Sequence, residues 1–171
     1  MKIKIAFYKG EGEFVNRIVR WWTKSPYSHA ELVLSDGATW IGISPFLKSE
    51  VSARKKDGIN LNEWEFIEFD ITQEQNDIIM QFYEETKGNR YDWFGMIASQ
   101  LLSPFVLKQR GHWYCSEWIA YALRIAGVFD WKAIKIYEQH DLSPGTLYRI
   151  ATEAKAYINI NDEKKGNYLY C

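Results

Sequence analysis

The chain has 171 residues and a mass of 20.2 kDa, which fits a single domain. Hydrophobic residues make up 47% and charged residues 25%, so the chain as a whole is not disordered, collagen-like or an extended coiled coil. The 21 Lys and Arg residues balance the 22 Asp and Glu residues to a formal net charge of -1. No global field attracts nucleic acid, and no nucleic-acid partner is expected.

The two cysteines, Cys115 and Cys171, do not form the pattern of a disulfide framework. Cys171 is the last residue, where chains fray, so we expect reduced thiols in a reducing compartment. The first ten residues lack the apolar run of a signal peptide. The longest uncharged stretch, residues 93–107, is too short to span ~30 Å of hydrocarbon. We therefore expect a cytoplasmic protein without a transmembrane span.

The spacing of apolar residues predicts an α+β chain, a small antiparallel sheet packed with helices. Strands are expected at 2–8, 29–34, 38–44 and near 63–71. Residues 45–62 are basic and polar and are expected to form a loop.

Helices are expected where apolar residues recur at helical spacing, at 13–23, from Thr72 to about Lys87, at 91–102 and at 115–126. Thr72 and Gln75 have the spacing of a capping box, which marks the start of the second of these helices. Ser143-Pro144 opens a short fifth helix, because proline suits the first helical position.

One predicted hairpin carries a polar face with room above it. Asp36-Gly37 is the strongest hairpin signal in the chain, because a type I′ turn needs positive φ at both central residues. With that loop, His29 lies opposite Ser44. Glu31 lies opposite Gly42 two residues along, so all four share one face. Gly42 has no side chain, and we expect it to leave space for a site.

Cys115 lies where the sequence WYCSEWIAYALRIAG becomes helical. The free N–H groups and dipole at a helix N-terminus stabilise a thiolate and lower the pKa of a thiol. A nearby imidazole has the same effect and can also carry the proton, and His29 is the best candidate. The sequence therefore suggests a Cys115–His29 dyad, the alternative being that both are ordinary core residues.

The segment SPYSHAELVL, followed much later by WYCSEWIAYAL, resembles the circularly permuted NlpC-type papain-like cysteine peptidases and amidases of the YiiX-like branch. In that order the histidine strand precedes the cysteine helix, as it also does in lecithin:retinol acyltransferase-like proteins. His29 matches the family histidine and Cys115 the nucleophile, and Ser116-Glu117 completes the Cys-Ser-Glu run. The region from Phe14 to Ser44 and the late SPGTLYR segment also resemble small phage and prophage proteins.

The resemblance implies a permuted papain-like fold over residues 1–158, followed by a polar C-terminal tail over residues 159–171. It implies a cysteine-dependent hydrolase or acyltransferase that attacks an amide, ester or thioester and forms an acyl-enzyme. The partner would be a small-molecule, peptide or lipid acyl substrate. No cofactor or metal is expected, since the chain has no Cys/His set at zinc spacing. The sequence does not give the oligomeric state.

The third member of this family's site is a polar residue, commonly His or Glu, on the strand after the histidine strand. The hairpin register places Ser44 there. A serine can accept a hydrogen bond from the imidazole, but it cannot stabilise imidazolium as a carboxylate does. Glu31, on the same face, is the alternative. A catalytically degenerate binding module of the same fold therefore remains a second possibility.

Aromatic residues make up 16% of the chain, and several lie within a few residues of the proposed dyad or on its hairpin, namely Tyr27, Trp40, Trp113, Tyr114 and Trp118. Trp40 shares the site face of the hairpin and is the first candidate to contact substrate, together with Tyr27 and Tyr114. In the first helix, Trp21 and Trp22 accompany Arg and Lys residues. This combination leaves open a third possibility, a peripheral membrane protein.

Overall fold

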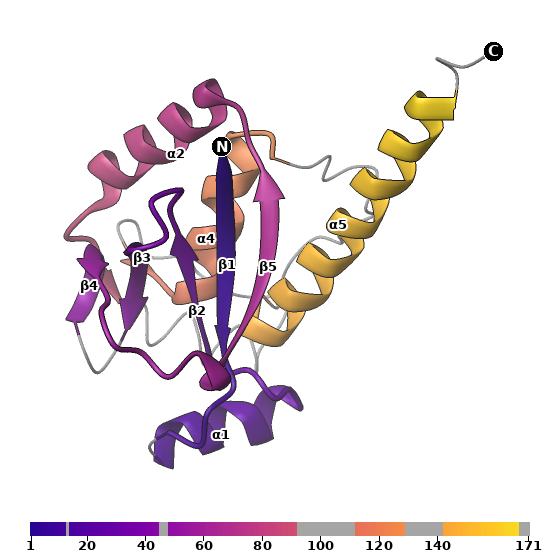
Figure 1. The fold of residues 1–171 in the computed structure, drawn as a ribbon. Helices are drawn as coiled ribbons and strands as arrows, with labels where there is room; N and C mark the ends of the chain where they lie inside the picture. The colour runs from indigo at the N-terminus through magenta and orange to yellow at the C-terminus, as the bar shows by residue number, and fades with distance from the viewer. Residues whose placement is uncertain (13, 45–47, 92–111, 129–141, 168–171) are drawn as a thin grey trace, which may run out of the picture.

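The computed structural model of the chain describes residues 1–12, 14–44, 48–91, 112–128 and 142–167. Within these ranges the protein is α+β, with helices packed against one face of a largely antiparallel sheet (Figure 1). This coarse architecture confirms the fold class expected from the sequence.

The sheet has seven described strands in the order β5-β1-β2-β3-β4-β6-β7. Neighbouring strands are antiparallel, except that β6 and β7 are parallel. The strands are β1 (Lys2–Tyr8), β2 (His29–Val33), β3 (Thr39–Ser44), β4 (Lys48–Lys55), β5 (Trp64–Asp70), β6 (Arg90–Tyr91) and β7 (His112–Trp113).

Four α-helices and one short 3-10 helix accompany the sheet in the described ranges. They are α1 (Phe14–Thr23), η1 (Leu61–Glu63), α2 (Gln73–Thr86), α4 (Cys115–Ile125) and α5 (Pro144–Asn167). Helix α4 packs across β2 and β3, α2 packs on α4, and α5 contacts β5. Helix α1 lies apart from these, at the end of the sheet where β1 stops and β2 starts (Figure 1).

The main hydrophobic core lies between the sheet and α4. Alternate residues of the strands point into it because successive strand side chains face opposite sides. Its largest fully buried side chains are Trp118, Phe7, Phe69, Ile3, Ile5, Leu32, Ile41, Ile43, Ile79, Ile119, Leu123 and Leu147. None of the described helices is long and apolar enough to cross a bilayer.

The expected capping box at the start of α2 is confirmed. Thr72 Oγ1 accepts a hydrogen bond from the Gln75 N–H, and the Gln75 side chain accepts one from the Thr72 N–H. The cysteine helix is also confirmed, since α4 begins at Cys115. The expected helix at 91–102 falls almost wholly outside the described residues, and Tyr91 itself belongs to β6.

The prediction of a loop over residues 45–62 was wrong, because β4 occupies Lys48–Lys55. This strand pairs with β3 and buries Val51, while Ala53 packs against the same core. The many charged residues of the segment concealed the alternation that these two apolar side chains mark.

The hairpin register was correct although the expected turn was wrong. Leu32 pairs with Ile41 and Val33 with Trp40, as a loop centred on Asp36-Gly37 requires. The loop nevertheless has four residues, closed by the Leu34 N–H donating to the Thr39 carbonyl. Gly37 has a φ of 70°, and Asp36 is not in the positive-φ region, so the turn is not type I′.

Helix α5 is longer than the short helix expected after Ser143-Pro144. It starts at Pro144 as predicted but continues for 24 residues to Asn167. The proposed boundary between residues 158 and 159 therefore falls inside this helix. The segment contains no further proline and is rich in Ala, Glu and Lys, which favour helix.

Candidate active site

Strand β2 carries His29 and Glu31 on the sheet face opposite the main core. His29 is the first residue of the strand and pairs with Tyr8 at the end of β1. Two residues along, Glu31 lies over Gly42 of β3, where an added Cβ would come within 2.8 Å of Glu31 Cγ. The space above Gly42 is therefore filled by the Glu31 side chain, which corrects the expectation of an open gap there.

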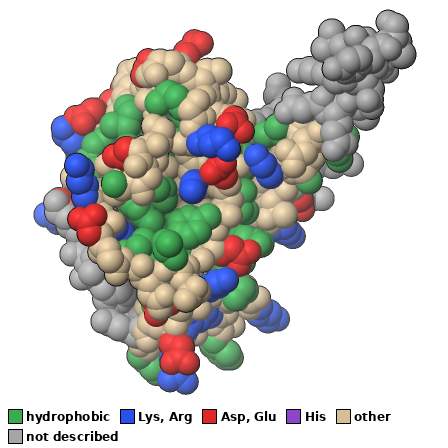
Figure 2. Space-filling view, viewed as in Figure 1, with side chains coloured by type: hydrophobic (Ala, Val, Ile, Leu, Met, Phe, Trp, Pro, Cys, Tyr) green, Lys and Arg blue, Asp and Glu red, His purple; other side chains and the backbone are tan. Residues whose placement is uncertain are grey.

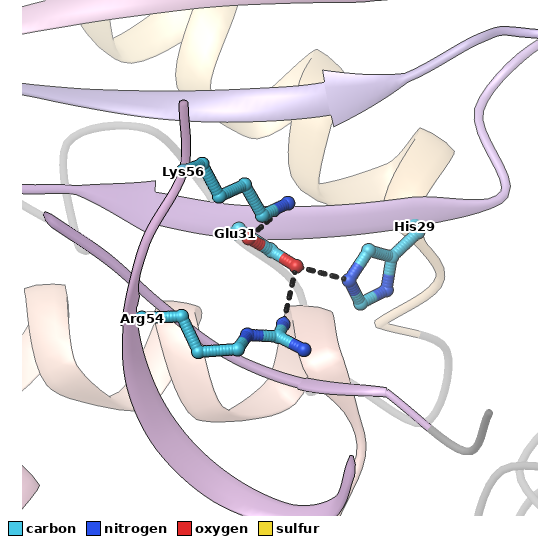
Figure 3. A network of polar contacts seen from close by, with 4 residues as sticks. All are labelled: His29, Glu31, Arg54 and Lys56. Carbon is cyan, nitrogen blue, oxygen red and sulfur yellow. Dashed lines mark hydrogen bonds and ion pairs between the residues drawn. The ribbon is translucent and has the colours of Figure 1, made fainter. Parts of the chain in front are cut away.

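Glu31 is fully buried, at 0% exposure, yet three basic side chains surround it (Figure 3). His29 Nε2 lies 3.0 Å from Glu31 Oε1, and Arg54 Nη2 donates to the same oxygen at 2.8 Å. Lys56 Nζ forms an ion pair with Oε2 at 2.7 Å. A buried carboxylate needs such partners, because an unpaired charge in the interior is strongly unfavourable.

Two tryptophans hold Lys56 in place. Its Nζ lies 4.5 Å from the ring centroid of Trp40 and 4.5 Å from that of Trp64. The two rings meet edge to face, with centroids 5.0 Å apart. Cation–π attraction to both rings restricts the lysine and thereby fixes the second oxygen of Glu31.

The thiol of Cys115 meets the imidazole of His29 where α4 begins beside the start of β2. The interaction between the two side chains raises the pKa of His29 and lowers that of Cys115, and the backbone of Ala30 and of Ser116 also lowers the pKa of the thiol. Nε2 of His29 faces Glu31, so Nδ1 is the ring nitrogen that the carboxylate does not engage. The structure thus brings Cys115, His29 and Glu31 together in one chain of polar contacts.

The charges around Cys115 and His29 favour transfer of a proton from the thiol to the imidazole. Burial alone raises the pKa of the Cys115 thiol, but the charge of His29 and the hydrogen bonds to sulfur outweigh it, so this pKa is lowered. Burial alone lowers the pKa of His29, but the charge of Cys115 and hydrogen bonds to Cys115 and Glu31 raise it to about 9. These opposite shifts both favour transfer of the thiol proton from Cys115 to His29.

The pKa of Glu31 is lowered, whereas the pKa of its partner His29 is raised. Burial would raise the pKa of Glu31, but the hydrogen bond and charge of His29 and the charge of Lys56 lower it to about 2. Glu31 is therefore ionised throughout the range in which Cys115 and His29 exchange a proton. A fixed anion at Nε2 orients the ring and stabilises its protonated form.

Of the two candidates for the third position, Glu31 is the one that the structure places against His29. Ser44 is buried at the end of β3, next to the undescribed residues 45–47. A register shift between Gly42 and Ser44 also interrupts the pairing of β3 with β4. The pairs recorded between β2 and β3 are Leu32 with Ile41 and Val33 with Trp40, and they do not extend to Ser44 and His29.

The aromatic residues expected to contact substrate are all largely enclosed. Trp40 is 2% exposed, packed with Val33 and beneath Trp64, so contact with a substrate would require these neighbours to move. Tyr114 is buried at the N-cap of α4. Tyr27 is also buried, and its hydroxyl donates to Glu65 Oε2 at 2.8 Å.

Tyr27 does, however, line an open hollow of about 400 Å³. The hollow lies between the α1–β2 connection and the start of α5, and its rim includes Lys24 and Arg149. Ser116, next to Cys115, donates to the carbonyl of Leu142, one residue before the hollow's wall at Ser143. The hollow is thus adjacent to the first turn of α4.

Arg54 and Lys56 were missed as site residues because their segment was assigned to a loop. Arg54 lies in β4 and Lys56 directly follows it, so extended backbone puts the two on one face at the strand spacing of two. The apolar residues Val51 and Ala53 on the opposite face were the available signal for that strand.

Among the described residues, no group of three or more His, Cys, Asp or Glu side chains could hold a metal ion. A comparison with models of known protein families finds no match, and no curated protein matches the chain significantly. The function of the chain is therefore inferred from the geometry of Cys115, His29 and Glu31.

Proposed function

We propose that the protein is a cysteine-dependent hydrolase or acyltransferase of the permuted papain-like type. The observation that carries the proposal is the contact chain from the Cys115 thiol through His29 to the buried carboxylate of Glu31. It unites a nucleophile at a helix N-terminus, a proton carrier and a fixed anion, the three parts that such catalysis needs.

The reaction would begin with attack of the Cys115 thiolate on the carbonyl carbon of an amide, ester or thioester. Free N–H groups in the first turn of α4 would stabilise the oxyanion of the tetrahedral intermediate. His29 would donate its proton to the leaving group as the carbon–heteroatom bond breaks, leaving an acyl-enzyme.

The second half of the reaction would restore the enzyme. His29, now neutral, would take a proton from water or from an acceptor alcohol or amine as that molecule attacks the acyl-enzyme. Loss of the Cys115 thiolate then releases an acid or a transferred acyl product. Glu31 would hold the ring orientation through both proton transfers, so we assign it a positioning role.

The proposal is tested with p-nitrophenyl acetate as an acyl donor. We expect an initial burst of p-nitrophenol and an acetyl group on Cys115, located by peptide mass spectrometry. The comparison variants are His29→Ala and Cys115→Ala, with Cys171 in the same chain as a reference thiol. Acylation of Cys115 no faster than that of Cys171, and unchanged by His29→Ala, would show that the site is not catalytic.

One observation favours the second candidate, a binding module without catalysis. Cys115 is only 4% exposed, and a reacting thiol must reach a carbonyl group. If the acylation experiment fails while His29 and Cys115 keep their contact, this second function becomes the better account.

A further inference from the structure

Helix α1 exposes a stripe of large apolar side chains. Phe14 is 72% exposed, Trp21 is 82% exposed and Ile18 is 38% exposed. Their spacing of four and three residues places them on one side of the helix. Trp22 and Val19, at other angles, are partly buried. Burial thus separates the adjacent tryptophans Trp21 and Trp22, which the sequence could not distinguish.

The helix is attached to the protein by its other side. The Arg20 guanidinium donates to the carbonyls of Gly10 and Glu11 in the segment before the helix. Because this contact and the partly buried side chains fix the orientation of α1, the outward direction of the stripe is a property of the fold.

Basic residues border the stripe. Arg17 is exposed and lies one turn before Trp21, and Lys24 is exposed directly after the helix. Helix α1 contains no Asp or Glu, although Glu11 and Glu13 precede it in the sequence. In Figure 2, hydrophobic and charged side chains lie side by side at the lower end of the molecule, where Figure 1 places α1.

Lys24 occupies a conformation that is uncommon for lysine. Its φ is 49°, and it is the only described non-glycine residue with a positive φ. It follows the last residue of α1, the position where helices usually end with glycine. The chain therefore keeps a cation beside the stripe where glycine would be less strained.

The stripe lies at the same end of the sheet as the proposed dyad. Helix α1 connects β1 to β2, and the residues at its two attachment points, Tyr8 and His29, pair with each other. The connection after α1 also supplies Lys24 and Tyr27 to the wall of the open hollow. A surface that bound α1 would therefore approach the hollow and the start of α4.

We propose that α1 docks the protein on an anionic lipid bilayer, with Phe14, Ile18 and Trp21 in the interfacial layer and Arg17 and Lys24 toward lipid phosphates. Aromatic side chains with flanking cations suit that layer, and binding follows from apolar burial plus attraction to anionic lipid. A stripe one helix wide also suits a bilayer better than a protein partner, which needs ~800 Å² on each side.

The test is co-sedimentation of the full chain with vesicles. One set contains phosphatidylcholine alone and the other adds phosphatidylserine. We expect binding to the mixed vesicles that weakens as salt is raised, and about tenfold or greater loss of partitioning for the double variant Phe14→Ala/Trp21→Ala. Arg17→Glu/Lys24→Glu is expected to remove the preference for phosphatidylserine.

Two control variants match these changes elsewhere on the surface. Tyr157→Ala removes an exposed aromatic residue from α5, and Lys55→Glu reverses an exposed charge on β4. Both variants are expected to bind the vesicles as the unaltered protein does. Failure of the unaltered protein to bind either vesicle would overturn the proposal. So would equal binding by Phe14→Ala/Trp21→Ala.

Self-association through α1 is a distinct outcome that would also overturn it. In that case light scattering would show a dimer that Phe14→Ala/Trp21→Ala dissociates, without vesicle binding. Acylation of Cys115, measured without lipid, is independent of these results. Failure of membrane docking and failure of the proposed catalysis are therefore distinguishable.

Discussion

The two faces of the sheet differ in what buries them. The inner face is covered by α4 and is apolar along β1, β2 and β3, with Ile5, Leu32 and Ile41 all fully buried. Over the outer face no described helix lies, and Figure 2 shows hydrophobic side chains in the middle of it. On this face Trp64 and Phe66 partly cover a smaller cluster that includes Trp40.

The outer face also contains the buried ionic group of His29, Glu31, Arg54 and Lys56. A buried ion pair contributes little net stability compared with apolar packing, because removing charges from water is costly. The apolar inner face therefore supplies most of the folding free energy, while the outer face supplies orientation. Substitutions on the inner face are therefore expected to change the free energy of unfolding alone, and substitutions around Glu31 are expected to change the reactivity of Cys115 as well.

The largest effect on stability is expected from the inner face. Leu123→Ala removes a fully buried side chain of α4 and should lower the free energy of unfolding by about 4 kcal/mol, as a cavity in a packed core does. Leu123 lies two turns from Cys115, so thiol reactivity of the folded protein should not change. Denaturant unfolding measures the loss, with the half-exposed Ile125→Ala as the control, expected below about 1 kcal/mol. Equal losses for both variants would contradict this assignment of the core.

Glu31→Gln should lower the free energy of unfolding by about 3 kcal/mol, because it leaves buried cations without their shared anion. Unlike Leu123→Ala, it should also slow alkylation of Cys115, since His29 loses its partner. The exposed Glu84→Gln is the control and should change neither quantity.

The stability difference between the unaltered protein and Glu31→Gln is expected to depend on pH. The pKa of Glu31 is about 2 in the folded protein, below its ordinary value of 4.5. Its contribution to stability is therefore fully present above pH 4.5 and is lost as the pH falls toward 2. The stability gap between the unaltered protein and Glu31→Gln should narrow over that range, and a constant gap would show that Glu31 is not held as an anion.

Gly42→Ala should have a smaller effect, about 2 kcal/mol, by overpacking. The new Cβ would lie 2.8 Å from Glu31 Cγ, and Glu31 cannot yield freely because its carboxylate is held by His29, Arg54 and Lys56. We expect slower alkylation of Cys115 as the carboxylate is displaced. Ser52→Ala, at the partner position on β4, is the control for a small change at this point of the sheet. If Gly42→Ala leaves the alkylation rate of Cys115 unchanged, the position of Glu31 does not control the reactivity of the thiol.

The smallest effect is expected at the hairpin loop. Asp36 Oδ1 accepts from the N–H groups of Ala38 and Thr39, and Oδ2 accepts from the Thr39 hydroxyl. Asp36→Ala should cost about 1 kcal/mol, as loss of a capping side chain does. Asp57→Ala, also at an exposed position, is the control. If Asp36→Ala lowers the free energy of unfolding no more than Asp57→Ala does, these hydrogen bonds do not stabilise the loop.

Local patterns in the sequence predicted β1, β2, β3 and β5, the helices α1, α2 and α4, the start of α5, and the pairing of β2 with β3. The register survived the wrong turn type because the four-residue loop is centred on the same two residues as the expected two-residue loop. The polar face with His29 and Glu31 followed from that register alone.

The charge network around Glu31 depends on contacts that no local pattern reports. Arg54 and Lys56 reach Glu31 only because β4 pairs with β3, and charged residues obscured that strand. The contact between Cys115 and His29 was inferred from residue chemistry and a family resemblance. Its geometry depends on how α4 packs across β2, which sequence spacing does not define.

The most direct test of the account is the rate of alkylation of Cys115 by iodoacetamide as a function of pH. Peptide mass spectrometry separates Cys115 from Cys171, which serves as the internal reference. We predict a midpoint for Cys115 well below the ordinary thiol pKa of about 8.5, and an upward shift of that midpoint in His29→Ala. A midpoint at or above the ordinary value, unchanged by His29→Ala, would contradict the thiolate–imidazolium pair on which the proposed function rests.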